Sequence, residues 1–489
     1  MSERRCLTRR DFMRTACAGA AALPFVPDRA DAALDRPNVL FIAIDDLNDW
    51  TECLGGHPQA RTPNLDRLAA RGVLFTNAHC AAPACNPSRA ALMTGIRPST
   101  SGVYTNSNIW RESPVLNNAV TIPQHFRKHG YSVAGSGKIY HGLYPDPPSW
   151  DEYWPSMNQT KPEDPMPDGM PINGIPNTRH FDWGPVNVNK GKMGDWQVAE
   201  WISGRLGQRH DRPFFLACGF YRPHLPWYVP PEYFDMFPLE DIVLPEVRDD
   251  DLDDVPEAGR RIARPEGDHA NVTGHHQWRQ AVQGYLASIA FADDCFGRVI
   301  DALDRSGYRD NTVIVLWSDH GWHLGEKLHW RKFALWEEAT HNVLAIIAPG
   351  VTAPAGRCDA PVNLLDIYPT LIDVCGLKPG SGLEGKSLEP QLRNPSLDRD
   401  RPTVTTHGRN NHSVRSKRYR YIQYADGSEE LYDHAHDPLE WENLASDPSY
   451  RNIKKYHARW LPRVNVEEIP RESADSRNAR QRRMNIQLP

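Results

Sequence analysis

Runs of consecutive apolar residues in the first three quarters of the chain are typical of buried β-strands. Residues 39–44, Val-Leu-Phe-Ile-Ala-Ile, are apolar without a break, which indicates a strand covered on both faces. Similar runs predict strands at residues 73–77, 131–134, 213–219, 312–317 and 343–348. Helical spacing of apolar residues predicts helices at residues 63–72, 88–94, 121–130, 278–305 and 363–375. This alternation predicts an α/β fold with a large, mostly parallel mixed sheet flanked by helices.

Two stretches lack any such periodicity. Residues 144–194 are rich in Pro, Gly, Asn and Trp, and residues 246–274 include an acidic run. Turn-forming and charged residues without an apolar stripe favour surface loops. We therefore expect both stretches to lie over the surface, where they can border a cleft.

The last quarter of the chain predicts a smaller unit of its own. A turn-rich stretch ends near residue 401, and it is followed by a predicted strand at 415–424 and a predicted helix at 448–460. We expect a main domain over residues 33–395 and a smaller C-terminal α+β subdomain over 396–470. The polar, basic residues 471–489 are predicted to be a disordered tail.

The first 32 residues carry the features of an export signal. Arg9 and Arg10 precede an apolar stretch at residues 15–26, and Ala30-Asp31-Ala32 offers small residues for cleavage. This order is typical of a twin-arginine signal peptide, and a disordered basic N-terminus is the alternative. We predict that residues 1–32 are removed and that the mature protein is periplasmic or secreted.

Composition excludes several classes of partner. The formal net charge of the 489 residues is −6, and the basic residues form no long stripe, so a nucleic-acid partner is not expected. Every apolar run is shorter than the roughly 20 residues that cross a bilayer, so the mature chain is expected to have no membrane partner. Seven cysteines follow the signal. The spacing of these cysteines matches no zinc-binding pattern. Because their number is odd, at least one thiol is unpaired.

The most informative segment is residues 85–95, Cys-Asn-Pro-Ser-Arg-Ala-Ala-Leu-Met-Thr-Gly. It resembles the sulfatase signature, Cys-x-Pro-Ser-Arg followed by an apolar pair and Thr-Gly. The resemblance extends over about residues 37–444, is strongest to the iduronate sulfatase branch, and implies the alkaline phosphatase superfamily fold. It also implies a sulfuric ester hydrolase in which a formylglycine-generating maturation enzyme oxidises Cys85 to formylglycine.

The resemblance implies a metal site at the ends of two predicted strands. Asp45 and Asp46 follow residues 39–44, and Asp319 and His320 follow residues 312–317. With residue 85 these are the implied metal ligands. Carboxylates are hard oxygen ligands that suit Ca²⁺, or Mg²⁺ as the alternative, whereas a soft thiolate at residue 85 suits neither ion. A hydrated aldehyde removes this mismatch, because one hydroxyl can bind the metal and attack sulfur while the other later expels sulfate.

Five further side chains take catalytic roles by the same resemblance. Lys138 and His141 lie in a Gly-Lys-x-x-His element, His224 in a Pro-His-x-Pro element, and Lys332 at the position of a second sulfate-contacting lysine. The cations of Lys138, Lys332 and Arg89 are expected to hold the sulfate oxygens. Either His224 or Lys332 would protonate the leaving oxygen, and His141 would then act as the base that releases sulfate.

The substrate expected from this resemblance is a sulfated sugar, as a polysaccharide or its oligosaccharides. Arg409, in the segment His-Gly-Arg-Asn-Asn-His, is the candidate for binding a sugar carboxylate. Two alternatives stay open. The first is a phosphatase or phosphonate monoester hydrolase of the superfamily, because the same metal site and anion-binding side chains would serve either kind of ester. The second is a non-catalytic protein that only binds sulfated glycans.

Overall fold

The computed structural model describes residues 36–178 and 180–484 of the chain. Residues Pro37–Pro489 form one compact unit, so the main domain and the C-terminal subdomain predicted above belong to the same unit. The predicted signal peptide lies outside the described residues. In the part of the chain that is described, no helix combines the length and the apolar composition needed to cross a membrane.

The centre of this unit is an eight-stranded sheet with the strand order β14-β2-β13-β9-β1-β7-β4-β5. Its strands are β1 (Asn38–Ile44), β2 (Val73–Phe75), β4 (Ser132–Gly137), β5 (Glu152–Trp154), β7 (Phe214–Phe220), β9 (Thr312–Ser318), β13 (Leu344–Ile347) and β14 (Gly356–Cys358). Strands β9, β1, β7, β4 and β5 run parallel, while β13 is antiparallel to both its neighbours. The predicted α/β fold with a mostly parallel mixed sheet is therefore confirmed.

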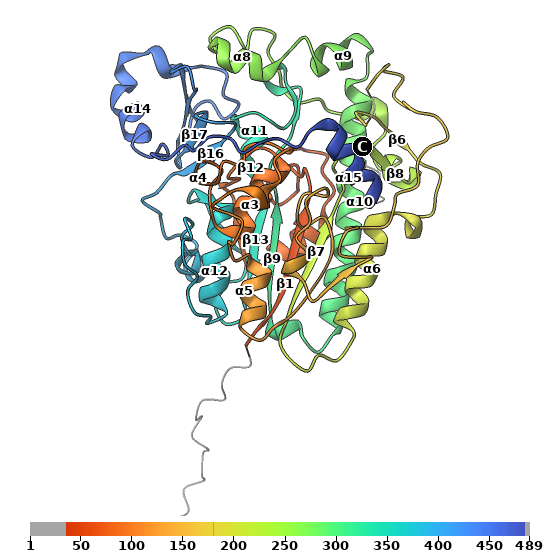
Figure 1. The fold of residues 1–489 in the computed structure, drawn as a ribbon. Coiled ribbons are helices and arrows are strands. Elements are labelled where there is room, and N and C mark those ends of the chain that lie inside the picture. The colour runs from red at the N-terminus through yellow and green to blue at the C-terminus, as the bar shows by residue number, and fades with distance from the viewer. Residues whose placement is uncertain (1–35, 179, 485–489) are drawn as a thin grey trace, which may run out of the picture. The chain divides into compact units, whose positions relative to one another are not determined.

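Helices cover both faces of the sheet (Figure 1). Alternate residues of a strand point to opposite faces, so Leu40, Ile42 and Ile44 of β1 join one apolar cluster, and Val39, Phe41 and Ala43 the other. The first cluster includes residues of α2 (Pro63–Ala69), α6 (Gly194–Leu206) and α10 (Trp278–Arg305). The second includes residues of α3 (Cys85–Thr94), α5 (Ile122–Lys128) and α12 (Ile367–Val374). The continuous apolar run of β1 is thus explained by burial on both faces.

The C-terminal part forms a separate four-stranded antiparallel sheet, β16 (Thr403–Thr406), β17 (His412–Arg415), β18 (Tyr419–Gln423) and β19 (Glu429–Asp433). Tyr421 and Leu431 of this sheet share an apolar cluster with Ile453 of α14 (Arg451–Ala458). Further short strands and α-helices are β3 (Ala78–His79), β6 (Trp183–Pro185), β8 (Trp227–Val229), β10 (His323–Leu324), β11 (Trp330–Arg331), β12 (His341–Asn342), β15 (Val362–Asn363), α4 (Pro98–Ser101), α7 (Pro231–Phe234), α11 (Glu337–Thr340) and α13 (Glu389–Arg393).

Three segments are more ordered than their composition indicates. The expected loop at 144–194 contains the strands β5 and β6, and β5 forms one edge of the central sheet. The expected loop at 246–274 contains the short helices α8 (Glu257–Ala263) and α9 (Asp268–Gly274). Within the tail predicted to be disordered, Ala474–Met484 forms helix α15, and residues 485–489 lie outside the description.

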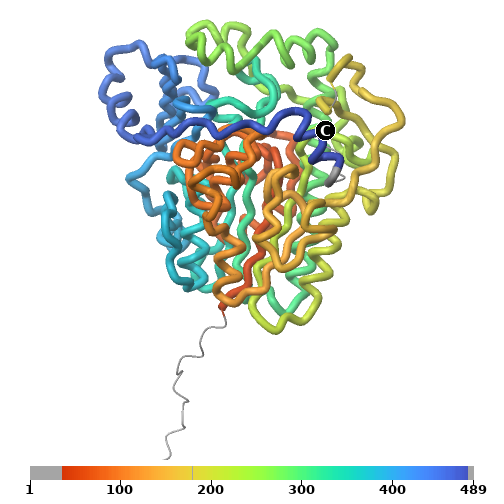
Figure 2. Tube along the Cα trace, in the orientation of Figure 1, coloured from red at the N-terminus to blue at the C-terminus, as the bar shows by residue number. Residues whose placement is uncertain are grey.

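Backbone hydrogen bonds connect the C-terminal end to an earlier part of the chain, and Ile469 adds an apolar contact with the core. The backbone amide groups of Val466 and Glu472 donate to the carbonyl oxygens of Ser99 and Ser107, at 2.9 and 2.8 Å. Figure 2 shows this stretch, in blue, running across the orange N-terminal segment. Backbone pairing of this kind leaves no apolar pattern in the sequence, which is why the composition pointed to disorder.

Candidate active site

Four neighbouring parallel strands end at one edge of the central sheet, and each delivers predicted site residues there. Asp45 directly follows β1, and Asp319 directly follows β9; the pairing of Ile44 with Ser318 sets these two aspartates beside each other. Lys138 directly follows β4, and His224 lies just beyond β7. Side chains from distant parts of the sequence therefore meet at the carboxyl edge, where α/β sheets bind ligands.

Helix α3 brings Cys85 to the same edge. Cys85 is the first residue of the helix, and every residue of α3 is buried. The Ser88 hydroxyl donates to the backbone carbonyl of Asp319 at 2.6 Å, and the Asn86 amide donates to the carbonyl of Asn108 at 2.8 Å. These bonds fix the first turn of the helix against the strand end that carries Asp319.

Side chains from four segments converge on the Cys85 sulfur, and we call them the Cys85 cluster. Distances from Sγ are 3.0 Å to Lys332 Nζ, 3.4 Å to His320 Nε2, and 3.8 Å to both Asp46 Oδ1 and Lys138 Nζ. Burial raises the pKa of the Cys85 thiol to about 12, although Lys138 and Lys332 act to lower it. An unmodified thiol in this place is protonated at neutral pH and is a weak nucleophile.

Arg89 lies between two of the predicted metal ligands. Its Nη2 donates to Asp45 Oδ1 at 2.7 Å and its Nε to Asp319 Oδ2 at 2.8 Å, while Nη1 donates to the carbonyls of Lys138 and Ile139. The side chain is fully buried. The guanidinium thus donates to two carboxylates and to the backbone, and its predicted contact with a sulfate oxygen stays a prediction.

The carboxylates and His320 fit a hard divalent cation. Ligand atoms of Asp46, Cys85, Asp319 and His320 all lie within 4.8 Å of one another, as do those of Asp45, Asp46, Cys85 and His224. Asp46 Oδ2 is buried without a hydrogen-bond partner among the described residues. His320 Nδ1 donates to the Gly321 carbonyl at 2.9 Å, which leaves the Nε2 lone pair 3.3 Å from Asp46 Oδ1. The carboxylate oxygens of these groups suit calcium, whereas an imidazole nitrogen is a less usual ligand for this ion.

Two lysines give the site fixed positive charge. Lys138 Nζ donates to Asp45 Oδ2, and Lys332 Nζ donates to Asp46 Oδ1 at 2.7 Å. Burial acts to lower the pKa of each lysine, but the nearby carboxylates outweigh it and raise both pKa values above the ordinary range. Both side chains therefore stay cationic at neutral pH and can bind an anion.

Burial favours the neutral form of the two predicted proton-transfer histidines. Burial, reinforced by Lys138, lowers the pKa of both His141 and His224 well below the ordinary value. His141 Nδ1 is buried and, among the described residues, has no hydrogen-bond partner. His224 Nδ1 donates to the Leu225 carbonyl at 2.5 Å, so its Nε2 faces the site, 3.8 Å from Asp46 Oδ2. A neutral His141 suits a base, whereas His224 must take up a proton before it can act as an acid.

The structure adds two aromatic residues to the site. The Lys138 ammonium lies 4.5 Å from the ring centroid of Tyr221, and the Lys332 ammonium lies 5.3 Å from that of Trp322. Aromatic faces attract cations and restrict where a long side chain can point. Tyr221 lies three residues before His224 and Trp322 two residues after His320, yet nothing in the sequence distinguished them from ordinary core aromatics.

Arg409 lies apart from these contacts. It is an exposed residue that donates to Glu467 Oε1 and to the Asn465 carbonyl, both at 3.2 Å. These contacts do not connect it with the Cys85 cluster. Its role in binding a substrate carboxylate stays a prediction.

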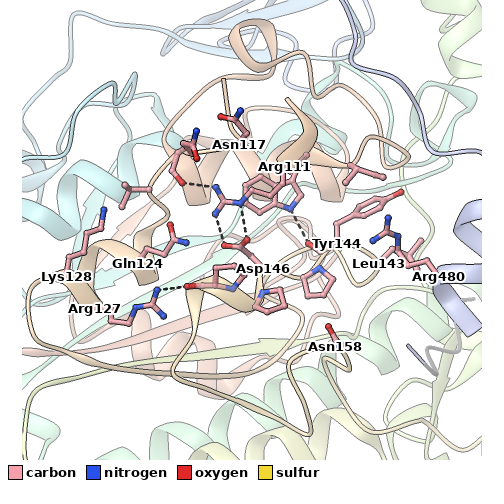
Figure 3. A pocket seen from close by; sticks show the side chains of 18 residues that line it. Arg111, Asn117, Gln124, Arg127, Lys128, Leu143, Tyr144, Asp146, Asn158 and Arg480 are labelled. Atoms are coloured by element: carbon pink, nitrogen blue, oxygen red, sulfur yellow. Dashed lines mark hydrogen bonds and ion pairs between the residues drawn. The ribbon is translucent and has the colours of Figure 1, made fainter. Parts of the chain in front are cut away.

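A pocket of about 650 Å³ opens on another part of the molecule (Figure 3). The predicted site residues all lie in the described chain, and none of them lines it. Arg111 at its centre pairs with Asp146 through two contacts of 3.0 and 2.7 Å, and Arg127 donates to the carbonyls of Pro148 and Trp150. The side chains of Arg111 and Arg127 are therefore engaged by the wall of the pocket itself.

Comparison with known proteins identifies family models, relatives and solved structures that are similar to this chain. The Sulfatase family model matches residues 37–377, and the model for the N-sulphoglucosamine sulphohydrolase C-terminal region matches residues 325–466. A sulfatase of Formosa agariphila is 42% identical over 452 residues, 88% of each chain. The iduronate 2-sulfatase of Mus musculus is 32% identical over 71% of this chain and 70% of its own. A solved phosphonate monoester hydrolase of Agrobacterium radiobacter is 25% identical with a TM-score of 0.70, covering 87% of this chain and 95% of its own.

Proposed function

The chain belongs to the sulfatase family and is a sulfuric ester hydrolase; from this premise we propose that it desulfates a sulfated sugar, using a formylglycine made from Cys85 and a bound calcium ion. The observation that carries the proposal is the Cys85 cluster. The segment that matches the maturation signature places its cysteine, buried, within 4 Å of two lysines, an aspartate and a histidine.

The proposed cation would be held by Asp45, Asp46, Asp319 and His320. Ligand atoms of Asp46, Asp319 and His320 lie close to one another and to Cys85, and one of Asp45 lies close to those of Asp46 and Cys85. When bound, calcium supplies a positive charge that polarises a sulfate oxygen and favours an ionised nucleophile. Arg89 keeps two of these ligands in place, because one guanidinium donates to both Asp45 and Asp319.

The side chains of this site suit the binding of a sulfate group and the transfer of protons. Lys138 and Lys332 carry fixed charges beside residue 85 and would hold the sulfate oxygens, where they also stabilise the charge that develops during transfer. The aldehyde of formylglycine, once hydrated, offers one hydroxyl for attack and a second for release of the product. Neutral His141 would accept the proton of that second hydroxyl, and either His224 or Lys332 would protonate the leaving oxygen.

The proposed substrate class is a uronic-acid-containing or related sulfated polysaccharide or its oligosaccharides. Similarity to an iduronate 2-sulfatase supports this choice, and Arg409 is the proposed partner of a sugar carboxylate. We also propose that the enzyme leaves the cytoplasm through the twin-arginine signal at residues 1–32. Export of a folded sulfatase would place it where such polysaccharides occur outside the cell.

The decisive experiment concerns residue 85 itself. Mass spectrometry of the tryptic peptide that covers residues 72–89 should show a species in which sulfur and two hydrogens are replaced by one oxygen. The Cys85→Ala variant should lose sulfate release entirely, since a methyl group can neither attack sulfur nor bind a metal. An unmodified cysteine in a fully active preparation would overturn the proposed nucleophile.

A phosphatase or phosphonate monoester hydrolase is the second candidate, because a phosphonate monoester hydrolase shares the fold at a TM-score of 0.70. Parallel assays with nitrophenyl sulfate, nitrophenyl phosphate and a phosphonate monoester discriminate between these reactions. We expect the largest kcat/KM for the sulfate ester. A larger value for either phosphorus ester would reassign the main activity.

A further inference from the structure

The segment that carries Lys332 has an unusual backbone. Between β10 and α11, Lys327, Leu328, Arg331 and Phe333 have positive φ angles of 54°, 48°, 72° and 73°. Residues with a Cβ atom rarely adopt this region, and each costs free energy that surrounding contacts must offset. Two of the four positions flank Lys332 directly. The place of the Lys332 side chain therefore depends on whatever holds this backbone.

His329 contacts the backbone of Lys332 directly. Its buried imidazole lies between two backbone carbonyls, with Nε2 2.8 Å from the oxygen of Lys332 and Nδ1 2.9 Å from the oxygen of Ala263. Both partners can only accept hydrogen bonds, so the ring serves as a donor. A neutral imidazole carries a single N–H and donates fully to one of the carbonyls at a time. His329 thus connects the last residue of α8 to the lysine beside Cys85.

Neighbouring contacts fix the same backbone from other directions. Arg331 donates to both carboxylate oxygens of Asp268 in α9, at 2.6 and 3.2 Å, and the amide of Phe333 donates to the Pro83 carbonyl at 3.0 Å. The backbone held by these contacts carries the Lys332 side chain, whose Nζ lies 2.7 Å from Asp46 Oδ1 and 3.0 Å from Cys85 Sγ. Helices α8 and α9, formed by a segment expected to be a loop, therefore contact His329 and Arg331 and support the backbone that carries the lysine.

We propose that His329 is a positioning residue for Lys332. Its Nε2–H bond to the Lys332 carbonyl holds the ammonium group where it meets the sulfate at residue 85. The inference rests on the proposed sulfate-binding role of Lys332. Displacing a reacting or binding group by about 1 Å can lower a rate about a hundredfold, so a single backbone bond at this place has a measurable effect on turnover.

Two amide substitutions separate this role from simple structural support. In His329→Gln the amide nitrogen reaches the place of Nε2 and keeps the bond to Lys332. In His329→Asn it reaches only the place of Nδ1 and keeps the bond to Ala263. We expect kcat for nitrophenyl sulfate to be at least about tenfold lower in His329→Asn than in His329→Gln, with similar melting temperatures. Equal kcat values, or a more active asparagine variant, would overturn the proposal.

A double-mutant comparison identifies Lys332 as the residue through which His329 acts. Lys332→Ala alone should lower kcat strongly, and adding His329→Asn to it should cause no further loss, because the positioned group is already gone. An equal further loss in both backgrounds would mean a general structural role and would overturn the inference. If Lys332→Ala itself left kcat unchanged, the proposed sulfate-binding role of Lys332 would fail, and the inference with it. The Lys332→Ala single variant thus tests the proposed role of Lys332 separately from the role of His329.

Discussion

At the scale of single residues, the Cys85 cluster is a balanced set of buried charges. Three carboxylates and three cations meet around residue 85: Asp45, Asp46 and Asp319 with Arg89, Lys138 and Lys332. Burying a lone charge costs several kcal/mol, so removing one partner leaves the other at a large penalty. Arg89 matters most for this balance, since one guanidinium serves two of the carboxylates.

Arg89→Lys should therefore be a severe substitution. A lysine ammonium is a point charge and cannot donate to Asp45 and Asp319 in the planar, two-sided way of a guanidinium. We expect the free energy of unfolding to fall by about 3–5 kcal/mol, the usual cost of breaking a buried pair, together with activity. Urea unfolding measures the change. Arg67→Lys is the matched control, since the exposed Arg67–Asp301 pair should change stability by less than about 1 kcal/mol; equal losses would contradict the role of Arg89.

The residue that protonates the leaving oxygen can be identified by comparing the turnover of substrates with different leaving groups. A sugar alcohol needs a proton in order to leave, whereas nitrophenolate leaves without much help, so loss of the acid should be selective. His224 faces the site through Nε2, while Lys332 already binds Asp46. We expect His224→Ala to lower turnover of a sugar sulfate at least about tenfold more than that of nitrophenyl sulfate. Lys332→Ala should lower both alike, and the reverse pattern would exchange the two roles.

At the scale of elements, the position of Lys138 depends on the close approach of β4 and β7. Gly137 pairs with Gly219 in the parallel ladder, and Gly137 has a φ of 82°. A Cβ atom at Gly137 would overlap the Gly219 carbonyl, and one at Gly219 would meet the backbone of Lys138. Glycine at both positions thus lets β4 turn and release Lys138 toward residue 85.

Gly137→Ala should disturb both stability and the site. The substitution combines an unfavourable positive φ with an overlap against backbone atoms that cannot move aside. We expect a loss of more than about 3 kcal/mol and a weaker interaction with sulfate as Lys138 shifts. Gly130→Ala is the matched control, because its φ is 89° but the space around its Cβ is open. It should cost only about 1–2 kcal/mol, measured by chemical denaturation, and leave KM unchanged; equal effects would show that the overlap is relieved.

The sequence predicted elements well where burial leaves a pattern. Strand β1 and helix α10 coincide with predicted segments because their apolar residues follow the period of the element. Helices α8, α9 and α15 escaped prediction because α8 and α9 are short and α15 is largely polar. The backbone around Lys332 could not be foreseen either, since its positive φ angles occur at Lys, Leu, Arg and Phe rather than at glycine.

At the scale of the whole molecule, the site depends on strand order as much as on motifs. The residues of the Cys85 cluster come from β1, α3, β4, β9 and the segment before α11, which together span most of the described chain. The motifs predicted which residues take part. The neighbour relation of β1 and β9, which sets Asp45 beside Asp319, came only from the structure, because apolar runs do not specify strand order. The contacts of Arg89 with both Asp45 and Asp319 likewise depend on this strand order.

A cation bound between such distant segments should stabilise the entire fold. A ligand that binds only the folded state adds about 2.7 kcal/mol at a concentration of one hundred times Kd. We therefore expect chelation to lower the melting temperature by several degrees and to abolish activity. Calcium should restore both better than zinc, because carboxylate oxygens dominate the proposed ligand set.

Two aspartate variants make this test specific to the site. In Asp319→Asn a proposed ligand loses its charge, so the melting temperature should no longer respond to calcium. In Asp268→Asn the ion pair with Arg331 is weakened outside the ligand set, and the response to calcium should persist even if the melting temperature itself falls. Differential scanning calorimetry with and without calcium measures both. A full calcium response in Asp319→Asn, or preferential rescue of the wild-type protein by zinc, would contradict the proposed calcium site, because the segments that carry Asp45 and Asp319 would then be held together without it.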